Sequence, residues 1–457
     1  MEALYKTNIN WFVFLGFAFL LFLIPGLSLL GYFAILVSLH QFLLLFYSVN
    51  YIVPIRYLFG FLMCIQFLIG PTLAYNGFDQ YQYFLYKMQI PESEYFSYAL
   101  PAVICFILGL HINSKLEGEQ LDRKAIQLFI ANRAQLPLIL IGVGFVSSFV
   151  AQFMASELGF VFYLLGGFKF IGVFILICSN TKLKVAPMAI VYISVISSSL
   201  SEGMFHDLIM WTIFLGLFYA IRYKPNIIFK VIFTIVFIII ITLIQILKAD
   251  YRTSLGSGDQ AGLETLNKAY EEKQNESGGG LFNINTLAPA VVRINQGFII
   301  TYVMKTVPAK VPFESGAEMY KILEAAILPR FIAHDKLRAG DKEIFMRYSS
   351  LRLREGTSMA LGSVGDAYVN FGIFGGCIFM FLLGALYNFA LKQFSKFSNF
   401  FPLLLLFTPL VFLYPIRPDC ELQTILGHFF KSIFFIYIVM VFYKKYFRIR
   451  EKQSFAI

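Results

Sequence analysis

The sequence predicts an all-α polytopic membrane protein, and two observations carry that prediction: the composition and the recurrence of long apolar segments. Hydrophobic residues make up 58% of the chain and charged residues only 14%, and the mean hydropathy is +0.71. So little charge does not solvate the surface of a globular protein of this length. Stretches of about 20 apolar residues, the length that a helix needs to cross the hydrocarbon core, recur along most of the chain.

We expect about twelve transmembrane helices, divided by one long connection. Helices one to nine belong to residues 1–247, a large loop with short helices to 248–358, and helices ten to twelve with a basic tail to 359–457. The first two helices are separated only by the turn dipeptide Pro25-Gly26. The expected spans are 11–26, 28–48, 55–75, 95–111, 136–153, 159–178, 186–201, 207–222, 227–247, 359–386, 400–415 and 424–442.

The distribution of Lys and Arg predicts the orientation, because basic connections stay in the cytoplasm. If both termini are cytoplasmic, the short outer connections hold only Lys87 and Arg417. The inner segments then hold Lys6, Arg56, Lys115, Arg123, Lys124, Arg133, Lys182, Lys184, Arg222, Lys224, Lys230, Lys392, Lys396, Lys444, Lys445, Arg448, Arg450 and Lys452. This arrangement puts the loop 248–358 outside the cytoplasm and accounts for the net charge of +10 without a nucleic-acid partner.

The long outer loop has three parts before its most basic stretch. Leu255–Gly280 is rich in Gly, Ser and mixed charge, which predicts a mobile linker. Gly316–Ile327 has the spacing of a short amphipathic helix that packs on a membrane surface or a partner helix. Asn285–Val307 is apolar with one polar helical stripe, so that Arg293 faces a polar space. The stripe consists of Arg293, Gln296, Gly297, Thr301 and Lys305.

The densest cationic stretch of the chain follows Pro329. Its members are Arg330, Lys336, Arg338, Arg347, Arg352 and Arg354. Fixed positive charge on this side of the membrane predicts an anionic ligand, and a diphosphate fits best because guanidinium groups bind phosphate oxygens bidentately. The alternative is that these cations pair with the acids of the same loop. Arg293 and Arg330 stand beside apolar residues without an adjacent acid, which makes them the strongest individual candidates.

The loop ends in a helix entry that is rich in small residues. Asp366 and Asn370 share one face near the start of this helix. An acid at this depth needs a partner or water, so we expect Asp366 to be the counter-ion of a loop arginine; the alternative is that it contacts substrate. Gly372 and Gly376 are spaced for close helix contact.

This stretch resembles a known family. The segments Ile327-Leu328-Pro329-Arg330-Phe331, Asp335-Lys336 and Gly365-Asp366-Ala367-Tyr368-Val369-Asn370-Phe371-Gly372 are similar to the Wzy-type O-antigen polymerases, which join oligosaccharide repeat units of bacterial surface polysaccharide. The similarity also covers the twelve-span plan with one large outer loop, and its sharp part covers about residues 290–380. The chain departs from the family pattern at Leu337, where a proline follows the lysine in the family.

The resemblance implies a metal-independent, cofactor-free membrane glycosyltransferase of the GT-C type in the bacterial plasma (inner) membrane. Such an enzyme transfers a growing glycan from undecaprenyl diphosphate to the next lipid-linked repeat unit, making O-antigen of lipopolysaccharide or capsule, and works in the bilayer with a chain-length regulator and a flippase. Arg330 and Lys336 fall on the family pattern for binding the diphosphate, and Arg293 and Arg338 extend it. Arg352, Arg354 and Asp366 support that site. His334 is the candidate base for the acceptor hydroxyl, with His206 and Glu202 on another outer connection.

Three other classes of protein stay open. A flippase for lipid-linked oligosaccharide would carry ionisable residues through its helices, whereas Lys169 and Lys431 are the only lysines or arginines well inside the expected spans. A transpeptidase would need an outward nucleophilic cysteine, and Cys420 stands between two acids that disfavour a thiolate. An O-antigen ligase shares the donor and the arginine chemistry and differs in its acceptor. No paired acids or histidines at metal-ligand spacing stand on an outer loop, so we expect no metal.

Overall fold

The computed structural model describes most of the chain as helices. It describes residues 9–77, 86–114, 119–154, 156–179, 185–257, 259–276, 284–328, 336–337, 340, 342–353 and 359–446. The regular elements in these ranges are α1 (Trp11–Phe22), α2 (Leu29–Ser48), α3 (Ile55–Cys64), η1 (Ile65–Ile69), α4 (Gly70–Tyr75), α5 (Glu92–His111), α6 (Arg123–Ala131), α7 (Leu136–Val150), η5 (Ala151–Phe153), α8 (Ser156–Gly166), α9 (Phe168–Cys178), α10 (Val185–Glu202), α11 (His206–Tyr223), α12 (Ile227–Gly256), α13 (Leu263–Glu276), α14 (Ile284–Ile294), α15 (Gly297–Thr306), α16 (Ala317–Ile327), α17 (Lys342–Ser349), α18 (Gly362–Ser398), η6 (Leu404–Phe407), α19 (Thr408–Phe412) and α20 (Leu422–Tyr446).

Nine helical stretches within the described residues are long and apolar enough to cross a membrane. They match nine of the twelve expected spans. Of the other three segments, 11–26 contains the short helix α1, and α11 is not among the nine. The segment 400–415 is not one continuous helix but the short pieces η6 and α19, buried in the core. Pro402 and Pro409 disfavour one continuous helix here, because a proline inside a helix removes a backbone hydrogen bond and clashes with the preceding turn.

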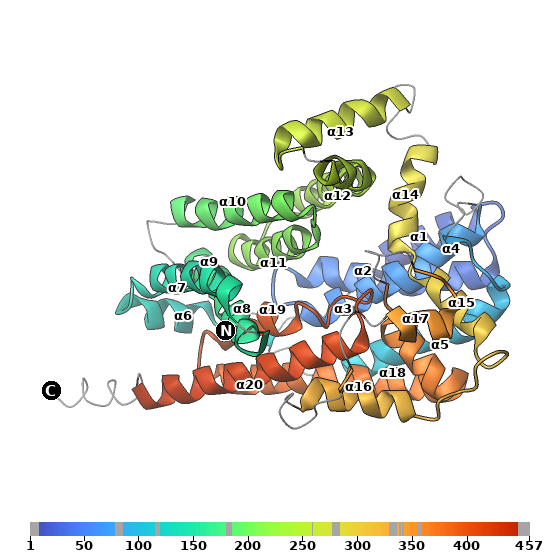
Figure 1. Cartoon of the computed structure of the whole chain (residues 1–457). Coiled ribbons are helices and arrows are strands. Elements are labelled where there is room, and N and C mark those ends of the chain that lie inside the picture. Colours follow the sequence, from blue (N-terminus) through green and yellow to red (C-terminus); the bar gives the residue numbers. More distant parts are fainter. Residues whose placement is uncertain are drawn as a thin grey trace.

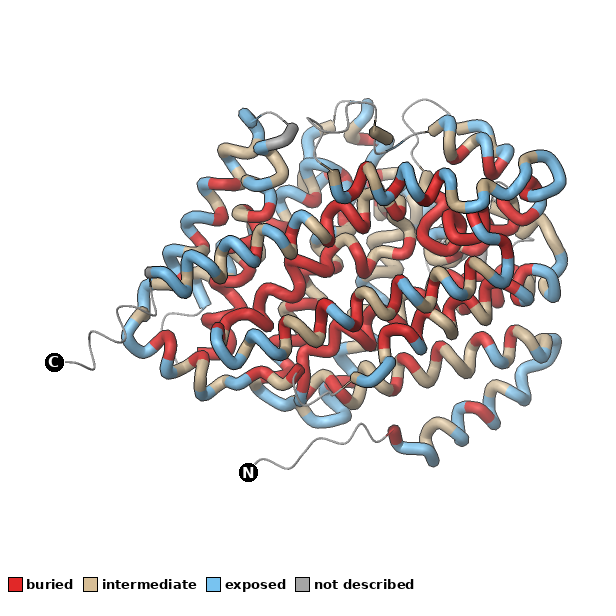
Figure 2. The backbone as a smooth tube through the Cα atoms, turned by 90° about the horizontal axis from the view of Figure 1, so that it is seen from below, coloured by how far each residue is buried: buried red, intermediate tan, exposed pale blue. Residues whose placement is uncertain are grey.

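The centre of the bundle is the pair α5 and α18, whose backbones touch. A Cβ atom on Gly109 would overlap the Phe381 carbonyl oxygen, and one on Gly384 would overlap the Phe106 carbonyl oxygen. Only glycine permits such an approach. Figure 2 shows the buried residues concentrated in the central helices and exposed residues along the N-terminal helix.

Gly372 has a different role from the one that its spacing predicts. The backbone of α18 leaves the helical conformation there, with φ of 65°, and such a positive φ favours glycine. A Cβ atom on Gly372 would make its closest contact, at 3.3 Å, with the ring of Phe313. Gly376, in contrast, does meet a neighbouring helix, because a Cβ atom there would lie 2.9 Å from the Tyr98 ring of α5.

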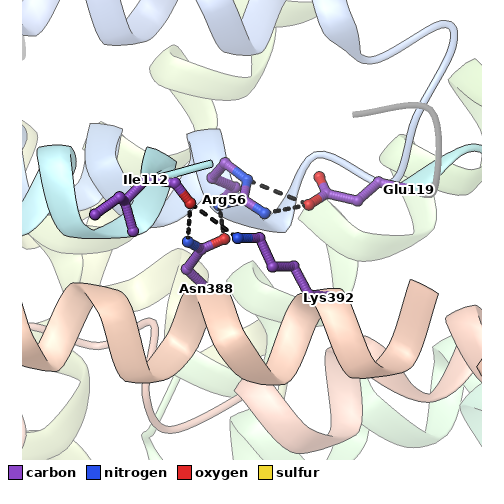
Figure 3. Close-up of polar contacts among 5 residues, drawn as sticks. All are labelled: Arg56, Ile112, Glu119, Asn388 and Lys392. Atoms are coloured by element: carbon purple, nitrogen blue, oxygen red, sulfur yellow. Dashed lines mark hydrogen bonds and ion pairs between the residues drawn. The ribbon is translucent and has the colours of Figure 1, made fainter. Parts of the chain in front are cut away.

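A buried polar network joins α3, α18 and the connection after α5 (Figure 3). Arg56 is 1% exposed, forms an ion pair with Glu119, and donates to Asn388 Oδ1 at 2.7 Å. Asn388 Nδ2 and Lys392 Nζ both donate to the Ile112 carbonyl oxygen, at 2.7 and 3.0 Å. Because a buried charge is tolerated only when it is paired and hydrogen-bonded, this network fixes how the three segments meet.

The long loop begins later and is more structured than the sequence predicts. The helix α12 continues to Gly256, nine residues beyond the expected boundary at 247. Within Leu255–Gly280, where we expected a linker, residues 263–276 form α13. Its Ala269 packs against Phe205 and Tyr251, so tertiary contacts stabilise a helix of polar composition. In Figure 1, α12 and α13 lie together at the top, while α15 and α17 lie at the right-hand end, far from the C-terminus.

The amphipathic helix expected at Gly316–Ile327 is confirmed as α16, and its partner is another helix. Met319, Ile322 and Ala326 are buried, and α16 packs on α20 and α18. Its first turn is held by α18, because the Met319 N–H donates to Asn370 Oδ1 at 2.9 Å. Glu314 adds a second link to this end of the bundle, since its Oε1 accepts from Arg347 and from the Tyr348 hydroxyl, each at 2.7 Å.

Candidate functional site: a cation-rimmed cavity

A cavity of about 1810 Å³ lies between α12 and the rest of the bundle. Its walls come mainly from α2, α3, α10, α11 and α12, and one end is lined by α14, Tyr86 and the connection before α20. This volume exceeds that of ordinary small-molecule pockets. Most of the lining side chains are apolar, with aromatic residues such as Phe42, Phe46 and Phe237 among them. The cavity therefore suits a large and mainly apolar ligand.

One face of α12 forms the longest wall of this cavity. Residues three or four positions apart share a helix face, and seven such residues line the cavity turn after turn: Lys230, Thr234, Phe237, Ile241, Gln245, Lys248 and Arg252. From Lys230 to Arg252 the helix rises about 33 Å, at about 1.5 Å per residue, which matches the thickness of a bilayer core. The middle of this face is apolar and its far end is cationic.

Five cations line the far end of the cavity. One of them, Lys273, lies 3.5 Å from Asp250 Oδ2, and we call the other four the rim: Lys248, Arg252, Arg293 and Arg417. Within the described residues, Lys248, Arg252 and Arg293 form no side-chain ion pair, whereas Arg417 lies 3.7 Å from Asp419. Desolvation by the surrounding protein lowers the pKa of the Arg293 guanidinium below its usual range, and the charge of Arg252 adds to this effect, although both residues are exposed. Because the rim cations outnumber the neighbouring acids Asp250 and Asp419, the rim is suited to an anion.

Arg293 is positioned by a helical segment of unusual geometry. The segment η1 is a π-helix, Ile65–Ile69, after which the Gly70 N–H donates to the Ile65 carbonyl oxygen. The next residue, Pro71, has no N–H, so the Gln66 carbonyl oxygen is left for another partner. The Gln66 carbonyl oxygen accepts from the Gln296 N–H at 3.1 Å. Close by, a Cβ atom on Gly70 would lie 2.7 Å from the Asn295 Cα atom. The last turn of α14, with Arg293, is thereby held against the bundle.

The polar stripe expected along Asn285–Val307 is wrong as a single helical face. The helix breaks at Asn295 and Gln296, between α14 and α15, because Gln296 donates to Gln66 rather than within a helix. Arg293 lines the cavity, whereas Thr301 is fully buried on α15 and accepts from the Gln89 N–H at 3.1 Å. Only the first part of the stripe therefore faces the predicted polar space.

Three other predicted residues that are described lie away from this cavity. Lys336 Nζ donates to the carbonyl oxygens of Leu328 and Ala325, at 2.8 and 3.2 Å, as cations do at the end of a helix. Arg352 is exposed. Asp366 is buried in α18 and lines a separate cavity of about 50 Å³ with Glu318 and Glu421.

The other predicted residues lie outside the described part of the chain. They are Arg330, His334, Arg338 and Arg354. Their roles remain predictions, and so does the expected pairing of Asp366 with a loop arginine. The structure thus brings Arg293 into a site with cations from other segments.

Sequence reasoning missed Lys248, Arg252 and Arg417 as members of this site. A signal for the first two was present, since Lys248 and Arg252 are one helical turn apart at the end of an apolar span that the charge distribution predicts to be outside, where the positive-inside bias disfavours cations. Arg417 was visible only as one of the two cations on short outer connections. Its approach to the α12 cations depends on how the broken segment 400–421 folds back.

A family model described as a domain of unknown function, DUF8712, matches residues 22–452 of the chain. The matched region includes the whole cavity. No curated protein and no solved structure matches the chain.

Proposed function

The chain belongs to the DUF8712 family, and we propose that it polymerises undecaprenyl-diphosphate-linked oligosaccharide repeat units into surface polysaccharide. In this proposal the protein has twelve spans and cytoplasmic termini, and acts on the outer face of the bacterial plasma membrane. The observation that carries the proposal is the cavity, which joins a long apolar wall to a cationic rim. A polyprenyl diphosphate has the same two parts in the same order.

The two parts of the cavity fit the two parts of the ligand for separate reasons. Apolar side chains along α12, such as Phe233, Phe237 and Ile241, favour an isoprenoid tail because its burial removes apolar surface from water. Arginine and lysine at the rim bind phosphate oxygens through charge-assisted hydrogen bonds. The lining residues at the rim also include Asp250 and Asp419, which moderate the net charge.

The rim would stabilise the diphosphate, which is the leaving group of the transfer. In the transfer, a hydroxyl of the incoming repeat unit forms a bond to the anomeric carbon of the growing glycan, and the bond from that carbon to the diphosphate oxygen breaks. The hydroxyl proton passes to a base, and the electron pair leaves with the diphosphate. Negative charge therefore grows on the diphosphate, and cations that are already held in place stabilise such charge.

Two of the alternative classes fit the cavity less well. A flippase must carry a polar headgroup across the membrane, but the α12 wall between Thr234 and Gln245 presents Phe237, Ile238 and Ile241. A transpeptidase needs a reactive thiolate. Burial raises the pKa of the Cys420 thiol to about 12, although Arg417 opposes this effect, so that thiol stays protonated.

Deletion of the gene tests the function and separates the remaining alternatives. In a deletion strain, we expect the surface glycan to collapse from a ladder to a single repeat unit, because single units are still flipped and attached. Loss of a flippase would remove even that single unit, and loss of a ligase would leave long polymer on the lipid carrier. A ladder of normal length would contradict the proposed function.

A further inference from the structure

The rim end of the cavity contains four buried polar atoms that have no hydrogen-bond partner among the described residues, and one of them, Asp250 Oδ2, lies 3.5 Å from Lys273 Nζ in an ion pair. The other three are Gln66 Oε1, His206 Nε2 and Arg417 Nε, and their side chains all line the cavity. Buried polar atoms in folded proteins are almost always hydrogen-bonded, because an unmet one loses the bonds that it made to water. Three such atoms from three separate segments in one cavity indicate a polar ligand.

These atoms belong to the same end of the cavity. His206 begins α11, and the charges of Arg417, Asp419 and Lys248 act on it. Gln66 lies in η1, and its own carbonyl oxygen accepts from Gln296, three residues after Arg293. The unpaired atoms therefore stand beside the rim rather than along the apolar wall.

The chemistry of the three atoms identifies the kind of ligand. The Gln66 Oε1 atom only accepts hydrogen bonds, and the Arg417 Nε–H group only donates. Burial, together with the charge of Arg417, lowers the pKa of His206 to about 4, so its neutral ring offers one donor and one acceptor. A diphosphate accepts hydrogen bonds but donates none, so it would leave the Gln66 Oε1 atom without a partner. A hydroxyl group both donates and accepts, and a sugar ring carries several.

We propose that Gln66, His206 and Arg417 form a subsite for a hydroxyl-bearing sugar ring, next to a diphosphate held by Lys248, Arg252 and Arg293. This inference rests on the proposed function and adds the position of the saccharide to it. It also separates the residues that bind sugar from those that bind phosphate. Replacing Gln66 or His206 should then change the affinity for the glycan without changing the affinity for the lipid diphosphate.

Binding measurements with two probes test the assignment. The purified full-length protein, in lipid nanodiscs, is titrated with undecaprenyl diphosphate and with undecaprenyl diphosphate that carries one N-acetylhexosamine. We expect the sugar-bearing probe to bind roughly tenfold more tightly, as a few added hydrogen bonds allow. Gln66→Leu and His206→Leu should each bring this ratio close to one, whereas His206→Gln, which keeps hydrogen-bonding groups, should retain part of it.

Matched controls keep the test interpretable. Gln127→Leu and His40→Leu replace the same residue types outside the cavity lining and should leave the ratio unchanged. Unchanged affinity for the bare diphosphate in the Gln66 and His206 variants shows that they are folded. A ratio of one in the wild-type protein, or an unaltered ratio in both leucine variants, would overturn the sugar subsite alone. If the wild-type protein binds neither probe, that result would instead contradict the proposed function itself.

Discussion

The Gln296 N–H donates to the Gln66 carbonyl oxygen at 3.1 Å, and this bond places part of the outer loop inside the bundle. It ends α14 directly after the turn that carries Arg293, and it begins the buried helix α15. The carbonyl is available because the Gly70 N–H donates to Ile65 instead and Pro71 has no N–H. The geometry of one membrane-embedded segment therefore decides where a loop arginine lies.

Enlarging Gly70 should displace Arg293 without unfolding the protein. In Gly70→Ala the added Cβ atom would lie 2.7 Å from the Asn295 Cα atom and the Ile294 carbonyl oxygen, so the end of α14 must move. We expect a destabilisation of about 1–3 kcal/mol and a clear loss of polymer in a ladder assay. Gly142→Ala is the matched control, because no atom lies within 4 Å of a Cβ there. Equal ladders from both variants would contradict the positioning role.

Removing single rim charges should weaken binding of the lipid diphosphate. Arg293→Ala and Lys248→Ala each remove a charge-assisted contact, so we expect a loss of affinity of roughly 10- to 100-fold. Arg293→Lys should recover only part of it, because lysine lacks the bidentate fork. Lys268→Ala removes an exposed cation on α13 that pairs with Asp259 and should have no effect. Titration with undecaprenyl diphosphate measures all four variants, and wild-type affinity in both alanine variants at the rim would exclude them from the site.

The Arg56 network should respond asymmetrically to single and double substitution. Arg56→Met leaves Glu119 buried without its partner, which we expect to cost about 3–5 kcal/mol and to lower the unfolding temperature in detergent. The double variant Arg56→Met/Glu119→Leu should regain most of this loss, because no uncompensated charge remains. Lys392→Met, at an exposed position of the same network, should change little. A double variant as unstable as the single one would show that the ion pair itself stabilises the fold.

The charge distribution predicts the sidedness of the bundle. A reporter inserted after Gly256, at the end of α12, should report the outer side, and one inserted after Asn399, at the end of α18, should report the cytoplasm. Activity-based reporters such as a phosphatase and a fluorescent protein measure the two locations independently. Identical locations for both insertions would rule out the proposed topology.

Features that depend on the local sequence pattern could be predicted from the sequence alone. Nine of the expected apolar segments are helices of spanning length, because such helices satisfy their own backbone hydrogen bonds. The helix α16 was predictable from the spacing of Met319, Ile322 and Ala326. Arg293 could be singled out because its neighbours in the sequence are apolar.

Features that depend on contacts between distant segments could not be predicted from local sequence patterns. The break after Arg293 depends on Gln66, more than two hundred positions earlier in the chain, and α13 depends on packing against Tyr251 and Phe205. Gly372 fits a close-packing motif by spacing, yet its backbone conformation creates a break in α18. The rim combines residues of three segments, so no single stretch of sequence contains its pattern.

The cavity has walls of unequal stiffness, which determines how a lipid could reach it. On one side, the wall formed by α2 and α3 packs on α5, and α5 in turn touches α18 through the backbone at Gly109 and Gly384, so moving that wall would open the core. On the other side, α12 is exposed along much of its length, as at Ile228, Ile232 and Ile239. Among the described helices, α12 packs mainly on α13 and α14, so it is the less constrained wall. In the proposed function, a long-chain lipid would enter sideways from the membrane past α12, while the wall formed by α2 and α3 keeps its position during repeated loading.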